Sequence, residues 1–132
     1  MMWNKTQQTA DFLLNKGMKN AEYGIVLGSG LGGLVEKIDI KERLPYEEIP
    51  NFPVSTVEGH AGELIYGELG GKTVVAMRGR FHYYEGYGMK ELTKPIRLLA
   101  GLGIKFLILT NAAGGINSSF KPGDLMLIED HI

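Results

Sequence analysis

The sequence predicts an α/β protein with a mixed β-sheet flanked by helices. Apolar segments of strand length alternate with segments of helical periodicity along the 132 residues. Gly70-Gly71 joins two strand patterns, as in a tight antiparallel hairpin, because glycine accepts the positive φ that such turns need. The continuous apolar segment 105–110 is instead typical of a strand inside a parallel sheet. Both kinds of pairing in one chain indicate a mixed sheet.

Two helices are expected from the spacing of apolar residues. Residues 6–16 carry Ala10, Leu13 and Leu14 on one side, and Gly17 is a natural stop. Residues 92–102 show the same spacing before Gly103. Pro95 is compatible with this second helix because it falls in the first turn.

Strands are expected where short apolar runs are bounded by glycine, proline or charged residues. These runs are residues 23–27, 63–69, 73–78, 105–110 and 124–129. The stretch 39–57 is charged and contains three prolines, so we expect mostly extended loop there. The apolar strand at 124–129 lies at the end of the sequence, which indicates part of a domain that is cut before it closes.

Composition excludes several classes of protein. The formal net charge is −1, so the basic excess of a duplex-binding protein is missing. The absence of cysteine excludes a disulfide scaffold, a cysteine-ligated zinc site and a cysteine nucleophile. The three histidines lack metal-ligand spacing, so we expect no metal. Neither a signal peptide nor an apolar run of membrane-spanning length is recognisable, and we expect a cytoplasmic protein without membrane or nucleic-acid partners.

Glycine is the one outlier in composition, with 19 of 132 residues, about twice its usual share. Gly28-Ser29-Gly30 opens a glycine-rich turn after the strand 23–27. Its spacing satisfies the dinucleotide fingerprint, but the acidic residue expected about 20 positions later falls in a proline-rich loop. Two interpretations remain open: a phosphate-binding turn with the Ser29 hydroxyl as an added donor, and a purely structural turn.

The loop 79–88 follows another strand and is dense in polar and aromatic residues. Arg80 offers a planar fork that suits phosphate oxygens. His82 can add a donor, and the nearby carboxylate of Glu85 can fix the tautomer of its ring. The tyrosines of this loop, Tyr83, Tyr84 and Tyr87, can stack on a sugar or simply pack. The alternative is an exposed loop with a surface salt bridge.

Residues 111–115 form a small-residue turn after a third strand. In open α/β sheets, ligands bind at the carboxyl ends of strands, and small side chains let backbone N–H groups approach an anion. A tight bend from strand to loop is the alternative. If the segments 28–33, 80–85 and 111–115 converge, they form a phosphate pocket beside a sugar-sized aromatic surface.

In their order, these motifs resemble the trimeric purine nucleoside phosphorylases of the inosine and guanosine type. The resemblance covers residues 20–132. It rests on Gly28-Ser29-Gly30-Leu31-Gly32, Ile49-Pro50-Asn51-Phe52-Pro53, Gly59-His60-Ala61-Gly62, Gly79-Arg80-Phe81-His82-Tyr83-Tyr84-Glu85-Gly86-Tyr87, Thr110-Asn111-Ala112-Ala113-Gly114-Gly115 and the segment 123–132. It implies a nucleoside phosphorylase-like fold, of which residues 1–132 are the amino-terminal part of a single domain.

The resemblance also implies an activity and roles for particular residues. The family converts a purine nucleoside and phosphate to free purine and ribose 1-phosphate, or the deoxy sugar, with phosphate as co-substrate and no cofactor. The implied phosphate ligands are Ser29, Arg80, His82 and the backbone N–H of Ala112. The implied supports of the phosphate site are His60, Gly28 and Gly30. Tyr84 is the implied sugar contact, and His82 and Glu85 are the implied catalytic pair.

Members of that family are about twice as long as this chain. The residues that recognise the purine lie in the half that this sequence does not match, so we expect the 132-residue chain to be inactive alone and to associate, as a homotrimer or another oligomer. One alternative is a methylthioadenosine or other nucleoside phosphorylase of the same fold. Alternatives of other classes are a non-catalytic phosphate- or nucleotide-binding module and a purely structural interaction domain.

Overall fold

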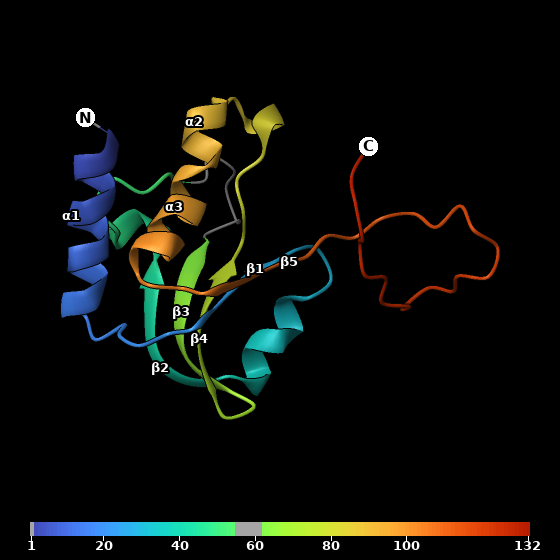
Figure 1. Ribbon diagram of the computed structural model, residues 1–132, viewed down its shortest axis with the longest axis horizontal. Coiled ribbons are helices and arrows are strands. Elements are labelled where there is room, and N and C mark those ends of the chain that lie inside the picture. Colours follow the sequence, from blue (N-terminus) through green and yellow to red (C-terminus); the bar gives the residue numbers. More distant parts are fainter. Residues whose placement is uncertain (1, 55–61) are drawn as a thin grey trace.

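A computed structural model describes residues 2–54 and 62–132, arranged around a five-stranded sheet (Figure 1). The strands are β1 (Tyr23–Leu27), β2 (Asp39–Pro45), β3 (Glu63–Leu69), β4 (Lys72–Arg78) and β5 (Phe106–Leu109), in the spatial order β2-β3-β4-β1-β5. β1 is parallel to both β4 and β5, whereas β3 is antiparallel to β2 and β4. The predicted mixed sheet is therefore confirmed.

Helices cover one face of this sheet (Figure 1). They are α1 (Met2–Asn15), α2 (Met89–Leu92) and α3 (Lys94–Gly101), with Pro95 in the first turn of α3 as expected. The predicted helix 92–102 is thus shorter, and a separate turn, α2, precedes it. Three short 3-10 helices complete the described elements: η1 (Gly32–Lys37), η2 (Tyr46–Glu48) and η3 (Tyr83–Glu85).

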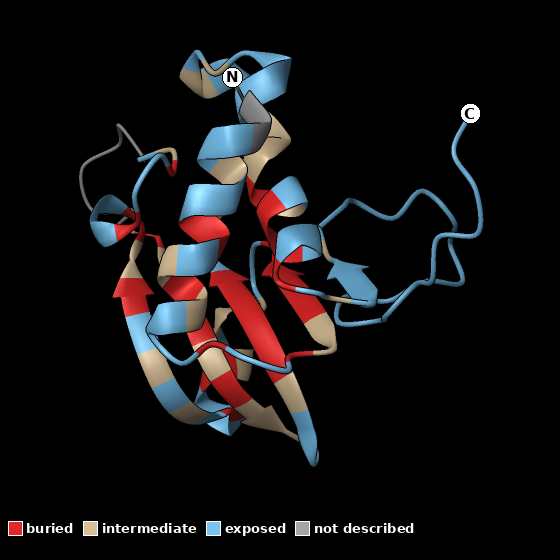
Figure 2. Ribbon diagram, turned by 60° about the vertical axis from the view of Figure 1, so that its left-hand side comes forward, coloured by how far each residue is buried: buried red, intermediate tan, exposed pale blue. Residues whose placement is uncertain are grey.

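The strands bury side chains on both faces because successive residues point to opposite sides. Val75 and Met77 of β4 join a cluster under α1 and α3, whereas Val74 and Ala76 join a second cluster on the opposite face with Val35 of η1. Figure 2 shows the buried residues concentrated in the central strands. The two clusters fix β4 and β1 firmly in the middle of the molecule.

The turn between β3 and β4 is the predicted two-residue hairpin. Gly70 has φ +57° and Gly71 has φ +74°, values that side-chain-bearing residues rarely adopt. The register pairs Leu69 with Lys72 directly across this turn.

The structure corrects the loop predicted for residues 39–57. Residues 39–45 form β2, which pairs with β3 from Asp39 opposite Glu68 to Pro45 opposite Glu63. This strand is at the edge of the sheet, so most of its side chains remain partly or fully exposed and charged residues are tolerated there. Pro45 ends the strand, where its missing N–H costs no ladder hydrogen bond.

The prediction of a strand at 124–129 is also wrong. From Asn111 onward the chain leaves the sheet as an exposed segment that makes no strand in the structure (Figures 1 and 2). Apolar composition is not sufficient for a strand, because its backbone groups also need a paired neighbour. β5 forms as predicted, but at the sheet's edge, and Phe106 to Leu109 are all exposed.

Among the described residues, no helix has the length and apolar character needed to cross a bilayer.

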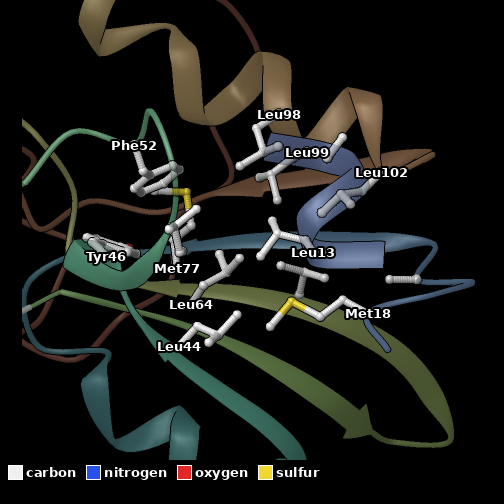
Figure 3. Close-up of a cluster of buried hydrophobic side chains, with 14 of the residues drawn as sticks. Leu13, Met18, Leu44, Tyr46, Phe52, Leu64, Met77, Leu98, Leu99 and Leu102 are labelled. Atoms are coloured by element: carbon white, nitrogen blue, oxygen red, sulfur yellow. The ribbon is translucent and has the colours of Figure 1, made fainter. Parts of the chain in front are cut away.

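Leu13 anchors α1 to the sheet and to α3. Its side chain is fully buried and faces the cluster that contains Leu98, Leu99 and Leu102 (Figure 3). Leu13→Ala is expected to lower the free energy of unfolding by about 2–5 kcal/mol, because it removes buried apolar contact and leaves a cavity. Urea denaturation measures this change. Gln8→Ala, at an exposed position of the same helix, is the control and should shift it by less than about 0.5 kcal/mol.

Candidate functional site

A cavity of about 460 Å³ opens at the carboxyl ends of β1 and β4. These two strands are parallel neighbours, so the segments that follow them meet at the same edge of the sheet. The residues that line it are Leu27, Gly28, Ser29, Gly30, Gly32, Tyr46, Gly62, Arg78, Gly79, Arg80, Phe81, His82, Tyr84 and Glu85. The glycine turn and the loop 79–85 therefore converge as the sequence predicts.

The glycine turn is held against the end of β5. The backbone N–H of Gly28 donates to the Thr110 hydroxyl oxygen at 2.7 Å. A Cβ at Gly28 would lie 2.6 Å from the Thr110 carbonyl oxygen and 2.9 Å from the Asn111 Cα. Only glycine allows the two backbone segments to approach this closely. Gly30 has φ +84°, which turns the chain toward η1.

Arg80 brings a fixed positive charge to the cavity. Its Nη1 donates to the Thr110 carbonyl oxygen at 2.9 Å, and the side chain is half-buried. A guanidinium has five N–H donors in one plane, so a single bond to a carbonyl orients the group and leaves further donors available. This is a geometry suited to an oxyanion.

His82, the residue before η3, and Glu85, its last residue, form a pair. The Glu85 carboxylate oxygen Oε2 lies 2.9 Å from His82 Nδ1 and accepts the His82 backbone N–H at 2.7 Å. The Glu85 side chain is only 7% exposed, so water competes little for these bonds. The carboxylate holds the proton on Nδ1 and leaves Nε2 for a ligand, as an acceptor in the neutral ring and as a donor in the charged ring.

Tyr84 extends the aromatic surface at the rim of the cavity. Its ring stacks on the His82 imidazole, with centroids 4.7 Å apart and an interplanar angle of 14°. The side chain is 82% exposed, so one face of the ring is open to a ligand. An open aromatic face next to a cationic pocket suits a sugar joined to an anion.

Tyr46 forms the floor beneath the loop. Its hydroxyl donates to the Gly79 carbonyl oxygen at 2.6 Å. Its ring packs against Phe81 and, as Figure 3 shows, against Phe52. Burial raises the pKa of the Tyr46 phenol well above its usual range, with a smaller contribution from the charge of Glu63. Tyr46 therefore acts as a neutral hydrogen-bond donor that sets the start of the Arg80 loop.

Most of the predicted site residues meet in this cavity. Gly28, Ser29, Gly30, Arg80, His82, Tyr84 and Glu85 all line it. Ala112 does not: it lies in the exposed segment after β5, although its neighbour Asn111 approaches Gly28. His60 falls outside the described residues.

Four residues at the site were given no role from the sequence: Tyr46, Gly62, Arg78 and Thr110. Gly62 lies against the Tyr46 ring, where a Cβ would come within 2.1 Å of a ring carbon. Arg78 lines the cavity while its Nη1 contacts Glu63 at 3.0 Å. Of these four, only Thr110 could have been recognised from the sequence, because it is the polar residue that ends an otherwise apolar strand.

The donor set of the cavity suits an anion rather than a metal ion. Arg78, Arg80 and His82 line the cavity together with one carboxylate, Glu85, which is already engaged by His82, and Arg78 is paired with Glu63 outside the lining. In residues 2–54 and 62–132, no three histidine, aspartate or glutamate side chains gather closely enough to hold a metal.

Comparison with known proteins places this geometry in a family. The model of the Phosphorylase superfamily matches residues 22–132. The chain belongs to this superfamily. Purine nucleoside phosphorylase 1 of Geobacillus stearothermophilus is 58% identical over 126 residues, and the Bacillus subtilis protein of the same name is 51% identical over 131 residues. The matches cover 96% and 99% of this chain, respectively, and confirm the family resemblance found in the motifs.

Solved structures of the superfamily share this fold. A purine nucleoside phosphorylase in complex with ribose-1-phosphate superimposes with a TM-score of 0.84 at 46% identity, over 92% of this chain and 44% of that chain. A Schistosoma purine nucleoside phosphorylase in complex with hypoxanthine gives a TM-score of 0.83 at 44% identity, over 92% of this chain and 42% of that one. The chain likewise spans 46% and 48% of the two bacterial relatives, less than half their length.

Gly28→Ala tests the close approach of the turn to β5. The added methyl group collides with backbone atoms of Thr110 and Asn111, which cannot move aside as a flexible side chain can. We expect the free energy of unfolding to fall by about 1–3 kcal/mol, the usual cost of overpacking. Gly32→Ala is the matched control, because its Cβ meets nothing within 4 Å. Equal effects of the two substitutions on urea denaturation would contradict this account.

The raised pKa of the buried Tyr46 phenol leads us to expect a loss of stability at alkaline pH. The folded state raises the pKa of this phenol, so the folded protein keeps a proton that the unfolded chain releases near pH 10. The stabilising contribution is complete below that pH and decreases as the pH rises above it. Urea denaturation at pH 8 and pH 11 is expected to show a smaller decrease for Tyr46→Phe than for the wild type. Parallel decreases would show that Tyr46 does not cause the effect.

Proposed function

We propose that this chain carries the phosphate site and part of the sugar site of a purine nucleoside phosphorylase. The observation that carries the proposal is the meeting of the glycine turn, Arg80 and the His82–Glu85 pair in one cavity. Relatives named purine nucleoside phosphorylase, 58% and 51% identical to this chain, support the reaction class. Residues 1–132 would then be the amino-terminal part of a single phosphorylase domain.

In this proposal, phosphate binds between the turn and the loop. Arg80 and His82 donate to its oxygens together with the Ser29 hydroxyl, while Gly28 and Gly30 shape the turn. The backbone N–H of Ala112 is proposed as a further donor, and His60, which is not among the described residues, as a support of the phosphate site. A fixed guanidinium and a hydroxyl in a partly enclosed pocket are charge-assisted donors that favour an anion.

The reaction follows from holding phosphate against the sugar. A phosphate oxygen forms a bond to the anomeric carbon as that carbon's bond to the purine nitrogen breaks. The electron pair of the broken bond leaves with the purine, which gains the hydrogen that hydrogenphosphate loses, directly or through solvent. The products are free purine and ribose 1-phosphate. The protein's contribution is alignment of the nucleophile and stabilisation of the cationic sugar by the adjacent anion.

Tyr84 is proposed to contact the sugar, and Glu85 to act through His82 by fixing its ring. No organic cofactor or metal enters this scheme. We also propose that the protein acts in the cytoplasm as a homotrimer or other oligomer, which the exposed apolar side chains of β5 support. The residues that bind the purine are assigned to the part of the relatives that this chain does not match.

Phosphorolysis of inosine tests the proposed function. The 132-residue chain, verified at 14.5 kDa by intact mass, is expected to bind phosphate without releasing hypoxanthine. A chimera that continues residues 1–132 with the remaining part of the Geobacillus stearothermophilus relative is expected to release hypoxanthine only when phosphate is present. A folded chimera without phosphate-dependent release would overturn the proposal and favour a binding module.

Arg80→Ala should weaken phosphate binding by about 1.5–3 kcal/mol, or roughly 10- to 150-fold, the range for a hydrogen bond to a charged group. Isothermal titration of the chain with phosphate measures the change. Arg97→Ala removes an exposed arginine of α3 that does not line the cavity, so its affinity should remain that of the wild type. Equal affinities for all three proteins would show that phosphate binds elsewhere.

A further inference from the structure

Thr110 is the residue at which β5, the glycine turn and Arg80 meet. Its hydroxyl oxygen accepts the Gly28 N–H at 2.7 Å and donates to the Val26 carbonyl oxygen at 2.8 Å. Its own N–H donates to the same Val26 carbonyl at 3.2 Å, and its carbonyl oxygen accepts Arg80 Nη1 at 2.9 Å. One residue thus bonds to the two segments that line the cavity.

We propose that Thr110 is a positioning residue for oxyanion binding, which it serves without touching the anion. Thr110 does not line the cavity, so any effect on a bound anion must pass through Gly28 and Arg80. This inference rests on the proposed function, because it assumes that the anion is phosphate held by the turn and Arg80. The inference adds Thr110 to the residues that form the site, with one function for its hydroxyl and another for its backbone carbonyl.

The Thr110 hydroxyl fixes the position of the glycine turn. A threonine hydroxyl has one hydrogen to donate, and here it goes to Val26, so the oxygen must present a lone pair to the Gly28 N–H. Gly28 is buried, and its N–H would lack this partner if the hydroxyl were removed. An unpaired buried donor is costly, so the turn would shift to recover a hydrogen bond. Ser29 follows Gly28 directly and would move with it.

The Thr110 carbonyl oxygen orients the Arg80 guanidinium. The bond from Arg80 Nη1 fixes the plane of the group relative to the sheet and leaves its other donors for an anion. Because Thr110 continues the β1–β5 ladder through Val26, both tasks depend on β5 being docked. Anion binding and the docking of β5 should therefore stabilise each other.

Phosphate titration of two Thr110 variants separates the hydroxyl from the shape of the side chain. Thr110→Val keeps the branched shape and removes the hydroxyl, and it is expected to raise the phosphate Kd about tenfold. Thr110→Ser keeps the hydroxyl and should stay within about twofold of the wild type. An unchanged Kd for Thr110→Val, or an equal loss for Thr110→Ser, would overturn the inference.

Thr9→Val is the control for a purely structural effect. Thr9 is buried, and its hydroxyl donates to the Pro50 carbonyl oxygen at 2.7 Å, with the Lys5 carbonyl oxygen at 2.9 Å, away from the cavity. Both valine variants are expected to lower the urea midpoint, but only Thr110→Val should change the phosphate Kd. A similar loss of affinity in Thr9→Val would assign the effect to general destabilisation and overturn the inference.

Hydrogen exchange on the wild-type chain tests the coupling without any substitution. Phosphate at about ten times its Kd should slow exchange at the Gly28 amide and along β5 by about tenfold, if opening of this region releases the anion. Unchanged exchange there, with phosphate bound, would overturn the inference while leaving the proposed function intact. Failure of the wild-type chain to bind phosphate would overturn the proposed function itself.

Discussion

Parallel pairing of β1 with both β4 and β5 is the constraint on which the rest of the structure depends. The register places Leu27 beside Arg78 and Val26 beside Leu109, so the three strands end nearly level. The segments that leave them therefore meet within hydrogen-bond distance at one edge of the sheet. An antiparallel neighbour would have sent one of these segments to the opposite edge. The remaining strands, β2 and β3, extend the sheet and bring Tyr46 and Gly62, at the end of β2 and the start of β3, to the same edge.

Different residues determine the shape of the cavity and its charge. Shape comes from backbone contacts that require glycine or a buried ring: Gly28 against Thr110, and Gly62 against Tyr46. Fixed positive charge comes from Arg78 and Arg80, which line the same cavity. The whole chain has a formal net charge of −1, so its overall balance says little about the local field. Arg78 is paired with Glu63 at 3.0 Å, whereas Arg80 bonds to a neutral carbonyl, so a small anion in the cavity responds chiefly to Arg80.

The parts of the fold that the sequence predicted are those with a complete local signal. The helix before Gly17, the hairpin at Gly70-Gly71 and the apolar strand β1 each carry their own periodicity and their own stop. β2 was missed because an edge strand tolerates charge and proline, which normally indicate a loop. The strand expected at 124–129 failed for the opposite reason, because an apolar run does not reveal whether a neighbour is available to pair with it.

The same division holds for the site. Arg80, His82 and Glu85 could be predicted because all three chemical groups lie within one short loop of the sequence, residues 80–85. Ala112 was expected in the cavity but lies outside it, since the path of the chain after β5 depends on contacts that no local pattern encodes. Tyr46 was missed because its role is a single long-range hydrogen bond to Gly79, 33 residues away along the chain.

The exposed edge strand β5 has a consequence for the behaviour of the chain in solution. Its outer backbone groups and four apolar side chains are accessible, and Lys105, the charge beside it, is already paired with Glu22 at 3.1 Å. Such an edge is a template for strand addition by another molecule, and natural proteins usually block it with charge, proline or a covering segment. We therefore expect self-association through this edge to increase with the concentration of the chain.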